Sequence, residues 1–201
     1  MTSRLRELYQ RCLAPVVVLL ARWGVSPTAV TVAGTVATVA AALWFLPRGQ
    51  AVLGTVVVLV CLLGDGLDGQ LARFSGRESR LGAFLDSTLD RMADAAILVG
   101  IGWWRLVEGD ALGLGLSLAV LVMGFLVSYA RARAEAEGWD ASVGLFERAD
   151  RLLLSLAGVL AVGLGAPEWA LWLALGVVAL GSAVTVGQRI AAAARAAPDA
   201  P

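Results

Sequence analysis

The chain has 201 residues, no net formal charge, and 59% hydrophobic residues, with a mean hydropathy of +0.78. This composition excludes an ordinary soluble domain and predicts an integral membrane protein. Histidine is absent, which excludes Ser-His and Cys-His catalysis and any histidine metal site. The two cysteines form neither a disulfide framework nor a metal-ligand pattern. A general base in this protein must therefore be a carboxylate or, less commonly, a tyrosine.

About six apolar segments approach the ~20 residues that a bilayer-spanning helix requires. They lack the alternation of strands, so we predict an all-α integral membrane protein with six transmembrane helices and an N-terminal interfacial amphipathic helix. Residues 1–201 would form one domain, made of a juxtamembrane helix (1–24), a six-helix core (28–191) and a disordered tail (192–201). The predicted spans are residues 28–46, 51–73, 82–104, 111–133, 151–165 and 169–189.

The N-terminal segment predicts an amphipathic helix over residues 2–23. Its apolar residues fall on one helical face, and Arg4, Glu7 and Arg11 fall on the other, as in helices that lie among lipid headgroups. The alternative is a positively charged flank of the first span. Ser26 and Pro27 then predict a helix start, as the N-cap and the first helical residue.

The arginines predict the orientation in the membrane. Of the 16 basic residues, all arginine, only Arg48 and Arg105 lie at one set of span ends, and Arg91 lies within a span. The other arginines lie at the opposite span ends, on the side of the membrane where both termini are predicted. The positive-inside rule therefore predicts a multi-pass protein of the cell membrane with cytoplasmic termini and a cytoplasmic active site.

Two pairs of aspartates lie in or beside apolar segments. Asp65 and Asp68 are three residues apart, and Asp86 and Asp90 are four apart, so each pair would share one face of a helix. Four carboxylates that face one another need a positive partner, and oxygen ligands of this kind suit a hard divalent ion such as Mg²⁺. The alternative is that they pair with neighbouring arginines to hold helices together.

The aspartates belong to a longer pattern. Asp65-x-x-Asp68-Gly69-x-x-Ala72-Arg73, then eight residues, then Gly82-x-x-x-Asp86-x-x-x-Asp90 resembles the signature of the CDP-alcohol phosphotransferase family at every fixed position. The resemblance implies two Mg²⁺ per subunit, with Mn²⁺ as an alternative. Asp65, Asp68 and Asp86 would bind one ion, and Asp65, Asp86 and Asp90 the other. Asp90 would also be the base that deprotonates the acceptor hydroxyl, which attacks the lipid-side phosphorus and displaces CMP.

The resemblance also implies a CDP-lipid-binding site and a homodimer. Gly69 and Arg73 would hold the pyrophosphate, with Ser79 nearby, and the turn from Thr28 to Thr31 would contact the nucleotide. The implied CDP-lipid-binding residues are Thr28, Ala29, Val30, Thr31, Gly69, Arg73 and Ser79.

Residues 128–135 and 144–151 resemble segments of actinobacterial phosphatidylinositol phosphate synthases. This implies CDP-diacylglycerol as the donor and inositol 1-phosphate as the acceptor, with arginines that bind the acceptor phosphate. Arg131 stands where those enzymes often have lysine, and Ala149-Asp150 replaces Pro-Glu, so the charge is kept. Alternatively, these arginines belong to a positively charged loop and pair with its acids. The implied acceptor residues are Ser128, Arg131, Arg148, Arg151 and Arg189.

The sequence thus predicts transfer of a phosphatidyl group from CDP-diacylglycerol to inositol 1-phosphate, giving phosphatidylinositol phosphate and CMP. The first alternative is phosphatidylglycerophosphate synthase, with glycerol 3-phosphate as the acceptor, or another CDP-alcohol phosphotransferase. An alternative of another class is a divalent-cation transporter, but the aspartates lie near the predicted cytoplasmic ends, and no internal repeat is visible. Membrane lipid is an expected partner, and nucleic acid is not.

Overall fold

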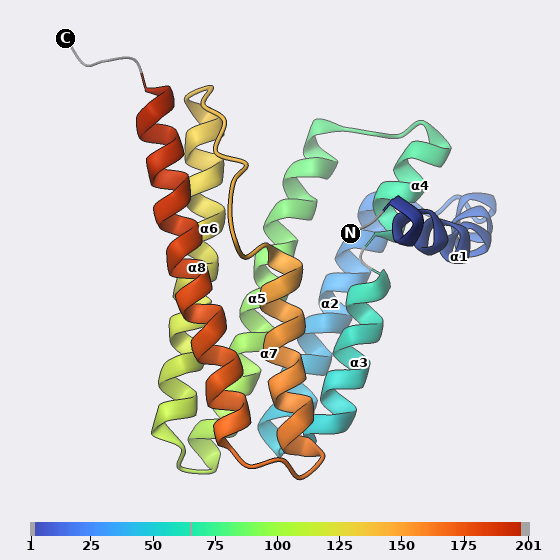
Figure 1. Ribbon diagram of the computed structural model, residues 1–201. Coiled ribbons are helices and arrows are strands. Elements are labelled where there is room, and N and C mark those ends of the chain that lie inside the picture. The colour runs from blue at the N-terminus through green and yellow to red at the C-terminus, as the bar shows by residue number, and fades with distance from the viewer. Residues whose placement is uncertain (1–2, 65, 198–201) are drawn as a thin grey trace. The chain divides into compact units, whose positions relative to one another are not determined.

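The computed structural model describes residues 3–64 and 66–197 and, over that part of the chain, its regular elements are all helical, as predicted. The side chains of residues 3–12 are outside the description. The helices are labelled in Figure 1. Their bounds are α1 Ser3–Arg22, α2 Pro27–Phe45, α3 Ala51–Gly64, α4 Leu67–Ser75, α5 Arg80–Val107, α6 Ala111–Ala136, α7 Arg148–Gly163 and α8 Trp169–Ala196, with a short 3-10 helix at Leu46–Arg48.

The chain divides into two compact units. The first comprises residues 1–41 and 56–93, and therefore holds α1, most of α2 and α3, all of α4 and the first half of α5. The second comprises residues 42–55 and 94–201, and holds the rest of α5 with α6, α7 and α8.

In the first unit, the start of α2 follows the sequence prediction. Gly24 has a left-handed backbone, with a φ of 70°, which ends α1. Ser26 accepts a hydrogen bond from the N–H of Ala29 at 3.2 Å, and Pro27 is the first helical residue. The N-cap prediction is thereby confirmed. Helix α1 packs along α4, and its predicted place among lipid headgroups stays a prediction.

The second predicted span is not one continuous helix. Helix α3 ends at Gly64, Gly66 has a non-helical backbone, and α4 begins at Leu67. Glycines on both sides of residue 65 weaken the helix at this point because glycine loses the most backbone freedom on ordering. Asp65 itself lies outside the described residues.

Four segments of the described chain are long and apolar enough to cross a membrane. They are Pro27–Arg48, Ala51–Ser75, Ala111–Ala136 and Trp169–Ala196. Helix α5 carries several charged residues, and α7 has 16 residues, or about 24 Å at ~1.5 Å per residue. Both helices form where spans were predicted, but the count of six transmembrane helices stays a prediction.

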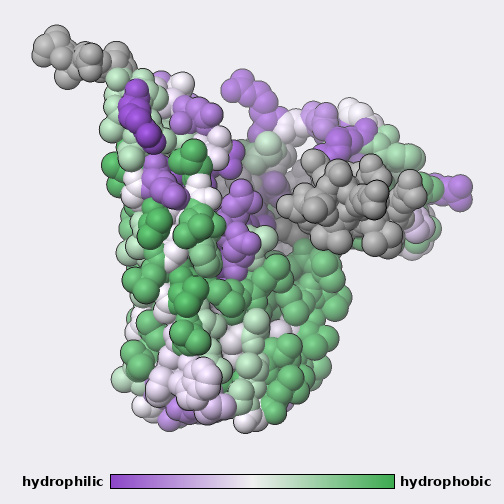
Figure 2. Space-filling view, viewed as in Figure 1, coloured by the Kyte–Doolittle hydropathy of each residue, from purple (hydrophilic) through white to green (hydrophobic). Residues whose placement is uncertain are grey.

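Helix α8 illustrates the apolar surface of the second unit. Leu173, Val177, Leu180 and Val184 follow one another at helical spacing and are 43–72% exposed. In Figure 2, hydrophobic side chains cover the middle of the face where α7 and α8 lie, and hydrophilic ones gather toward its upper end. Such a surface suits lipid contact. The helix continues to Ala196 through an alanine-rich end, since alanine is the best helix former, so the prediction of a disordered tail from residue 192 is wrong for residues 192–196.

A buried arginine joins the ends of three helices in the second unit. Arg105 is 0% exposed and forms ion pairs with Glu108 at 2.8 Å, Asp110 at 2.7 Å and Glu168 at 2.8 Å. The indole N–H of Trp172 also donates to Asp110 at 2.8 Å. Burial opposes ionisation of Asp110, but hydrogen bonds from Gly113, Trp172 and Arg105 outweigh it and hold the pKa of that carboxyl below its usual value. Sequence analysis placed Arg105 at a span end and did not identify its acidic partners.

Candidate active site

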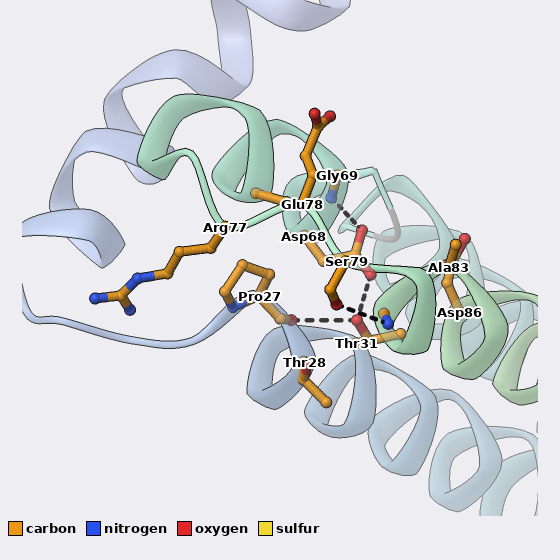
Figure 3. Close-up of a pocket in the computed structure, with 12 residues that line it drawn as sticks. Pro27, Thr28, Thr31, Asp68, Gly69, Arg77, Glu78, Ser79, Ala83 and Asp86 are labelled. Carbon is orange, nitrogen blue, oxygen red and sulfur yellow. Dashed lines mark hydrogen bonds between the residues drawn. The ribbon is translucent and has the colours of Figure 1, made fainter.

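The first unit contains a pocket of about 220 Å³ between the start of α2, helix α4 and the start of α5. Figure 3 shows that side chains from these three elements surround it. Six residues predicted from sequence as metal or CDP-lipid ligands line it. They are Thr28, Thr31, Asp68, Gly69, Ser79 and Asp86.

Asp68 is held firmly at this pocket. It is only 8% exposed, and its Oδ1 accepts a hydrogen bond from the N–H of Gly69 at 2.6 Å. Its Oδ2 accepts one from the hydroxyl of Thr31 on α2. The Thr31 hydroxyl also lies 3.1 Å from the carbonyl of Pro27, but the bond to a carboxylate is the stronger one (Figure 3). The two donors fix the orientation of the Asp68 carboxylate.

Two glycines of the predicted pattern line this pocket. A Cβ at Gly69 would lie 3.7 Å from the guanidinium of Arg73, so Arg73 folds back over Gly69. A Cβ at Gly82 would lie 3.0 Å from Oγ of Ser79, which accepts a hydrogen bond from the Gly82 N–H at 3.0 Å. Ser79 thereby caps the first turn of α5, the helix that carries Asp86.

Helix α5 carries its acids on one face. Asp86, Asp90 and Asp94 are spaced four residues apart on this continuous helix. Asp86 lines the pocket, whereas Asp90 is outside its lining and lies 3.6 Å from the guanidinium of Arg91.

The donor set suits a hard divalent cation, because the buried Asp68 and the half-buried Asp86 offer carboxylate oxygens to one pocket. Among the described side chains, those of residues 13–64 and 66–197, no three acidic or cysteine side chains gather closely enough to hold a metal ion. Asp65, which the sequence pattern places in both metal sites, is outside those residues. The four-aspartate set therefore stays a prediction.

The pocket departs from the predicted ligand list in two ways. Ala29, Val30 and Arg73 are not among its lining residues, although they neighbour residues that are. Arg77 and Glu78 line it without having been predicted as ligands. They follow the left-handed Gly76, where the chain turns from α4 toward α5. The guanidinium of Arg77 extends away from Thr31 and Asp68 (Figure 3).

The predicted acceptor residues all lie in the second unit, and two of them meet beside Gly124 on α6. The hydroxyl of Ser128 donates to the carbonyl of Gly124 at 3.0 Å. A Cβ at Gly124 would lie 3.6 Å from Nε of Arg151, whose side chain is buried and reaches α6 from α7. The Arg151 side chain and the Ser128 hydroxyl thus both lie next to Gly124, a proximity that sequence analysis did not identify.

Two further arginines complete the cluster. Arg189 on α8 donates to the carbonyls of Val127 at 2.6 Å and Val143 at 2.9 Å. The charges of Arg131 and Arg189 repel each other. Arg131 also pairs with Glu135 at 2.7 Å on the exposed side of α6. Arg189 therefore braces the loop between α6 and α7 while it adds positive charge next to Ser128.

The loop between α6 and α7 is tied to α8 at two more points. The N–H of Leu145 donates to Gln188 at 2.9 Å, and the N–H of Phe146 donates to Thr185 at 3.0 Å. Arg148, the first residue after this loop, pairs with Asp94 of α5 at 2.9 Å. Four of the five predicted acceptor residues thus cluster where α6, α7 and α8 meet, and the fifth contacts α5.

Comparison with known proteins identifies the family. The profile of the CDP-alcohol phosphatidyltransferases matches residues 24–180. The chain belongs to the CDP-alcohol phosphatidyltransferase family. It is 44% identical to the phosphatidylinositol phosphate synthase of Streptomyces avermitilis, over 97% of this chain and 83% of that protein. The synthase of Cutibacterium acnes is 41% identical, over 98% and 99% of the two chains.

Solved structures agree with this family assignment. The phosphatidylinositol phosphate synthase of Mycobacterium tuberculosis with CDP-DAG bound superposes with a TM-score of 0.87 at 36% identity, covering 91% of this chain and 94% of that one. The same enzyme in complex with manganese and citrate gives a TM-score of 0.85, and the match covers 90% of this chain and 88% of that one. The resemblance read from the aspartate pattern is confirmed, and this family member is a membrane enzyme that transfers a phosphatidyl group.

Proposed function

We propose that this phosphatidyltransferase makes phosphatidylinositol phosphate and CMP from CDP-diacylglycerol and inositol 1-phosphate. The observation that carries the proposal is the near full-length similarity to phosphatidylinositol phosphate synthases, one of them solved with CDP-DAG bound. The pocket at Asp68 and the arginine cluster beside Ser128 supply the two kinds of ligand that this reaction needs.

The carboxylates serve the donor. Asp65, Asp68, Asp86 and Asp90 would hold two Mg²⁺ ions, which neutralise the pyrophosphate of the CDP-lipid when bound. Gly69 lets the pyrophosphate approach the backbone, with Arg73 and Ser79 beside it, and the turn from Thr28 to Thr31 contacts the nucleotide. A neighbour solved with manganese supports the use of a divalent ion.

Asp90 serves the chemical step. It accepts the proton of the acceptor hydroxyl, whose oxygen forms a bond to the lipid-side phosphorus. The bond from that phosphorus to the CMP oxygen breaks, and CMP leaves with the electron pair. Ser128, Arg131, Arg151 and Arg189 bind the phosphate of the acceptor, as bidentate arginines do best.

The membrane arrangement is part of the proposal. We infer six spans, with α5 and α7 crossing beside the four apolar segments, and α1 lying among cytoplasmic headgroups. The distribution of arginines supports cytoplasmic termini and a cytoplasmic active site in the cell membrane. We also propose a homodimer, which rests on family resemblance.

An acceptor panel tests the proposed reaction. Purified protein in detergent or lipid receives CDP-diacylglycerol and Mg²⁺ with inositol 1-phosphate, inositol or glycerol 3-phosphate, and CMP is measured. We expect CMP release with inositol 1-phosphate and less than about one-hundredth of that rate with inositol, because the arginines bind a phosphate. Turnover with glycerol 3-phosphate alone would assign the protein as a phosphatidylglycerophosphate synthase. Divalent-ion flux into liposomes without CMP release would favour a transporter.

The Thr31–Asp68 hydrogen bond gives a prediction at the donor site. Thr31→Val removes the hydroxyl that orients Asp68, so the KM for CDP-diacylglycerol should rise about tenfold, since a bond to a charged group contributes about 1.5 kcal/mol. Thr38→Val is the matched control, because the Thr38 hydroxyl bonds to Gly34 of its own helix at 2.9 Å. An unchanged KM in Thr31→Val would show that Asp68 needs no such support.

A further inference from the structure

An ion pair joins α7 to α5 within the second unit. Nε of Arg148 lies 2.9 Å from Oδ1 of Asp94, and the two side chains are only 25% and 14% exposed. The exposed Arg131–Glu135 pair, by contrast, has side chains 51% and 55% exposed. Because the Arg148–Asp94 pair is better shielded from water and bridges two helices, it can hold the start of α7 against the middle of α5 more firmly than a surface pair would.

Asp94 and Arg148 each lie within about one helical turn of a residue of the proposed active site. Asp94 follows Asp90, the proposed base, by one turn of α5. Arg148 is the first residue of α7, whose start is fixed by a reciprocal capping box between Glu147 and Asp150. Arg151 lies one turn further along α7, beside Ser128 on α6. The pair therefore ties the helix that carries the base to the turn that presents a proposed phosphate ligand.

We propose that Asp94 and Arg148 are positioning residues for the phosphorylated acceptor. Their pair fixes the first turn of α7 against α5 and thereby places Arg151 for the acceptor phosphate, an inference that rests on the proposed function. Arg148 then acts through Asp94 and does not bind the phosphate directly, unlike the role predicted for it from the sequence. Asp94 is outside the aspartate pattern of the family, so this inference assigns a role to a residue that the pattern does not include.

A double-mutant cycle tests this role. Asp94→Asn, Arg148→Gln and the double variant are compared with the wild type for the KM of inositol 1-phosphate, the KM of CDP-diacylglycerol and kcat. We expect each single change to raise the acceptor KM about tenfold, the double variant to match the single ones, and the donor KM to stay within about twofold. If Arg148 bound the phosphate itself, Arg148→Gln alone would raise the acceptor KM and Asp94→Asn would not. That result would overturn the inference.

Two controls sharpen the cycle. Arg133→Gln removes an arginine of α6 whose ion pair with Glu137 is exposed, at 58% and 41%, and should leave both KM values unchanged. Asp94→Glu keeps the charge but displaces the carboxylate by one methylene, so it should give an intermediate acceptor KM. If Asp94→Asn does not fold, Asp94→Glu is measured in its place. An acceptor KM equal to that of the wild type in Asp94→Glu would then contradict the inference.

The outcome is separable from the proposed function. If the wild type uses a different phosphorylated acceptor, the proposed reaction fails, and the same cycle is measured with that acceptor. If the wild type uses inositol 1-phosphate but the neutral variants lower kcat without changing the acceptor KM, the reaction stands and the positioning role is wrong.

Discussion

Asp90→Asn should lower kcat by at least about 10³-fold while the affinity for CDP-diacylglycerol changes by less than about threefold. A positioned general base contributes about 10²–10⁴ in rate, and asparagine cannot accept the proton of the acceptor hydroxyl. Asp90 is outside the lining of the pocket at Asp68, and the other three aspartates would still bind Mg²⁺ beside the pyrophosphate, so the variant should largely retain CDP-lipid binding. CMP release and binding of the CDP-lipid are measured separately on the same preparation.

Asp140→Asn is the matched control for this change. Asp140 lies in the loop between α6 and α7, where its carboxylate accepts from the N–H and the hydroxyl of Ser142. The same loss of one carboxylate there should leave turnover near the wild-type value. Wild-type turnover in Asp90→Asn would refute the role of Asp90 as the base.

The second large effect concerns stability. Arg105→Gln should destabilise the protein by about 3 kcal/mol, because it leaves the carboxylates of Asp110, Glu108 and Glu168 without their cation. Most of this cost arises at Asp110, which is 6% exposed, since Glu108 and Glu168 are 42% and 53% exposed and can be hydrated. In detergent, the variant should lose its monodisperse size-exclusion peak at a lower temperature than the wild type does.

Arg48→Gln is the control for the stability measurement. Arg48 is exposed, donates to the carbonyl of Trp44 at 2.6 Å and stacks on the Trp44 ring, without a carboxylate partner among the described ion pairs. It should shift the transition only slightly. Equal shifts in Arg48→Gln and Arg105→Gln would mean that the buried cluster contributes no more than a surface arginine.

Much of the helical framework could be predicted because it depends on local sequence. Ser26 and Pro27 set the start of α2, and runs of apolar residues set the lengths of α6 and α8. The break between Gly64 and Leu67 was missed because an apolar run followed by an i, i+3 aspartate pair favours a continuous helix. The weakening effect of the two glycines there competes with that pattern and prevails.

The candidate site was predicted as far as it follows one linear pattern. Asp68 and Gly69 of α4 and Gly82 and Asp86 of α5 come to one pocket, as their spacing on neighbouring helices predicts. The partners that hold them come from elsewhere in the chain. Thr31 reaches Asp68 across 37 residues, and Arg148 reaches Asp94 across 54. Spacing within a helix carries no information on such pairs.

The roles of the arginines could also be predicted only in part from the sequence. Counting them predicted the orientation of the spans but could not distinguish an exposed arginine from a buried one. Arg105 was counted as an outer charge and is 0% exposed, bonded to three acids. Arg189 was predicted to bind phosphate and also holds two backbone carbonyls. These roles depend on tertiary neighbours, which composition does not reveal.

The most direct measurement is anomalous diffraction from crystals of the wild type soaked with Mn²⁺ and CDP-diacylglycerol. The account predicts Mn²⁺ peaks beside the carboxylates of Asp65, Asp68, Asp86 and Asp90, in contact with the pyrophosphate of the lipid. Bound lipid with Mn²⁺ at other residues and none at these four carboxylates would contradict it.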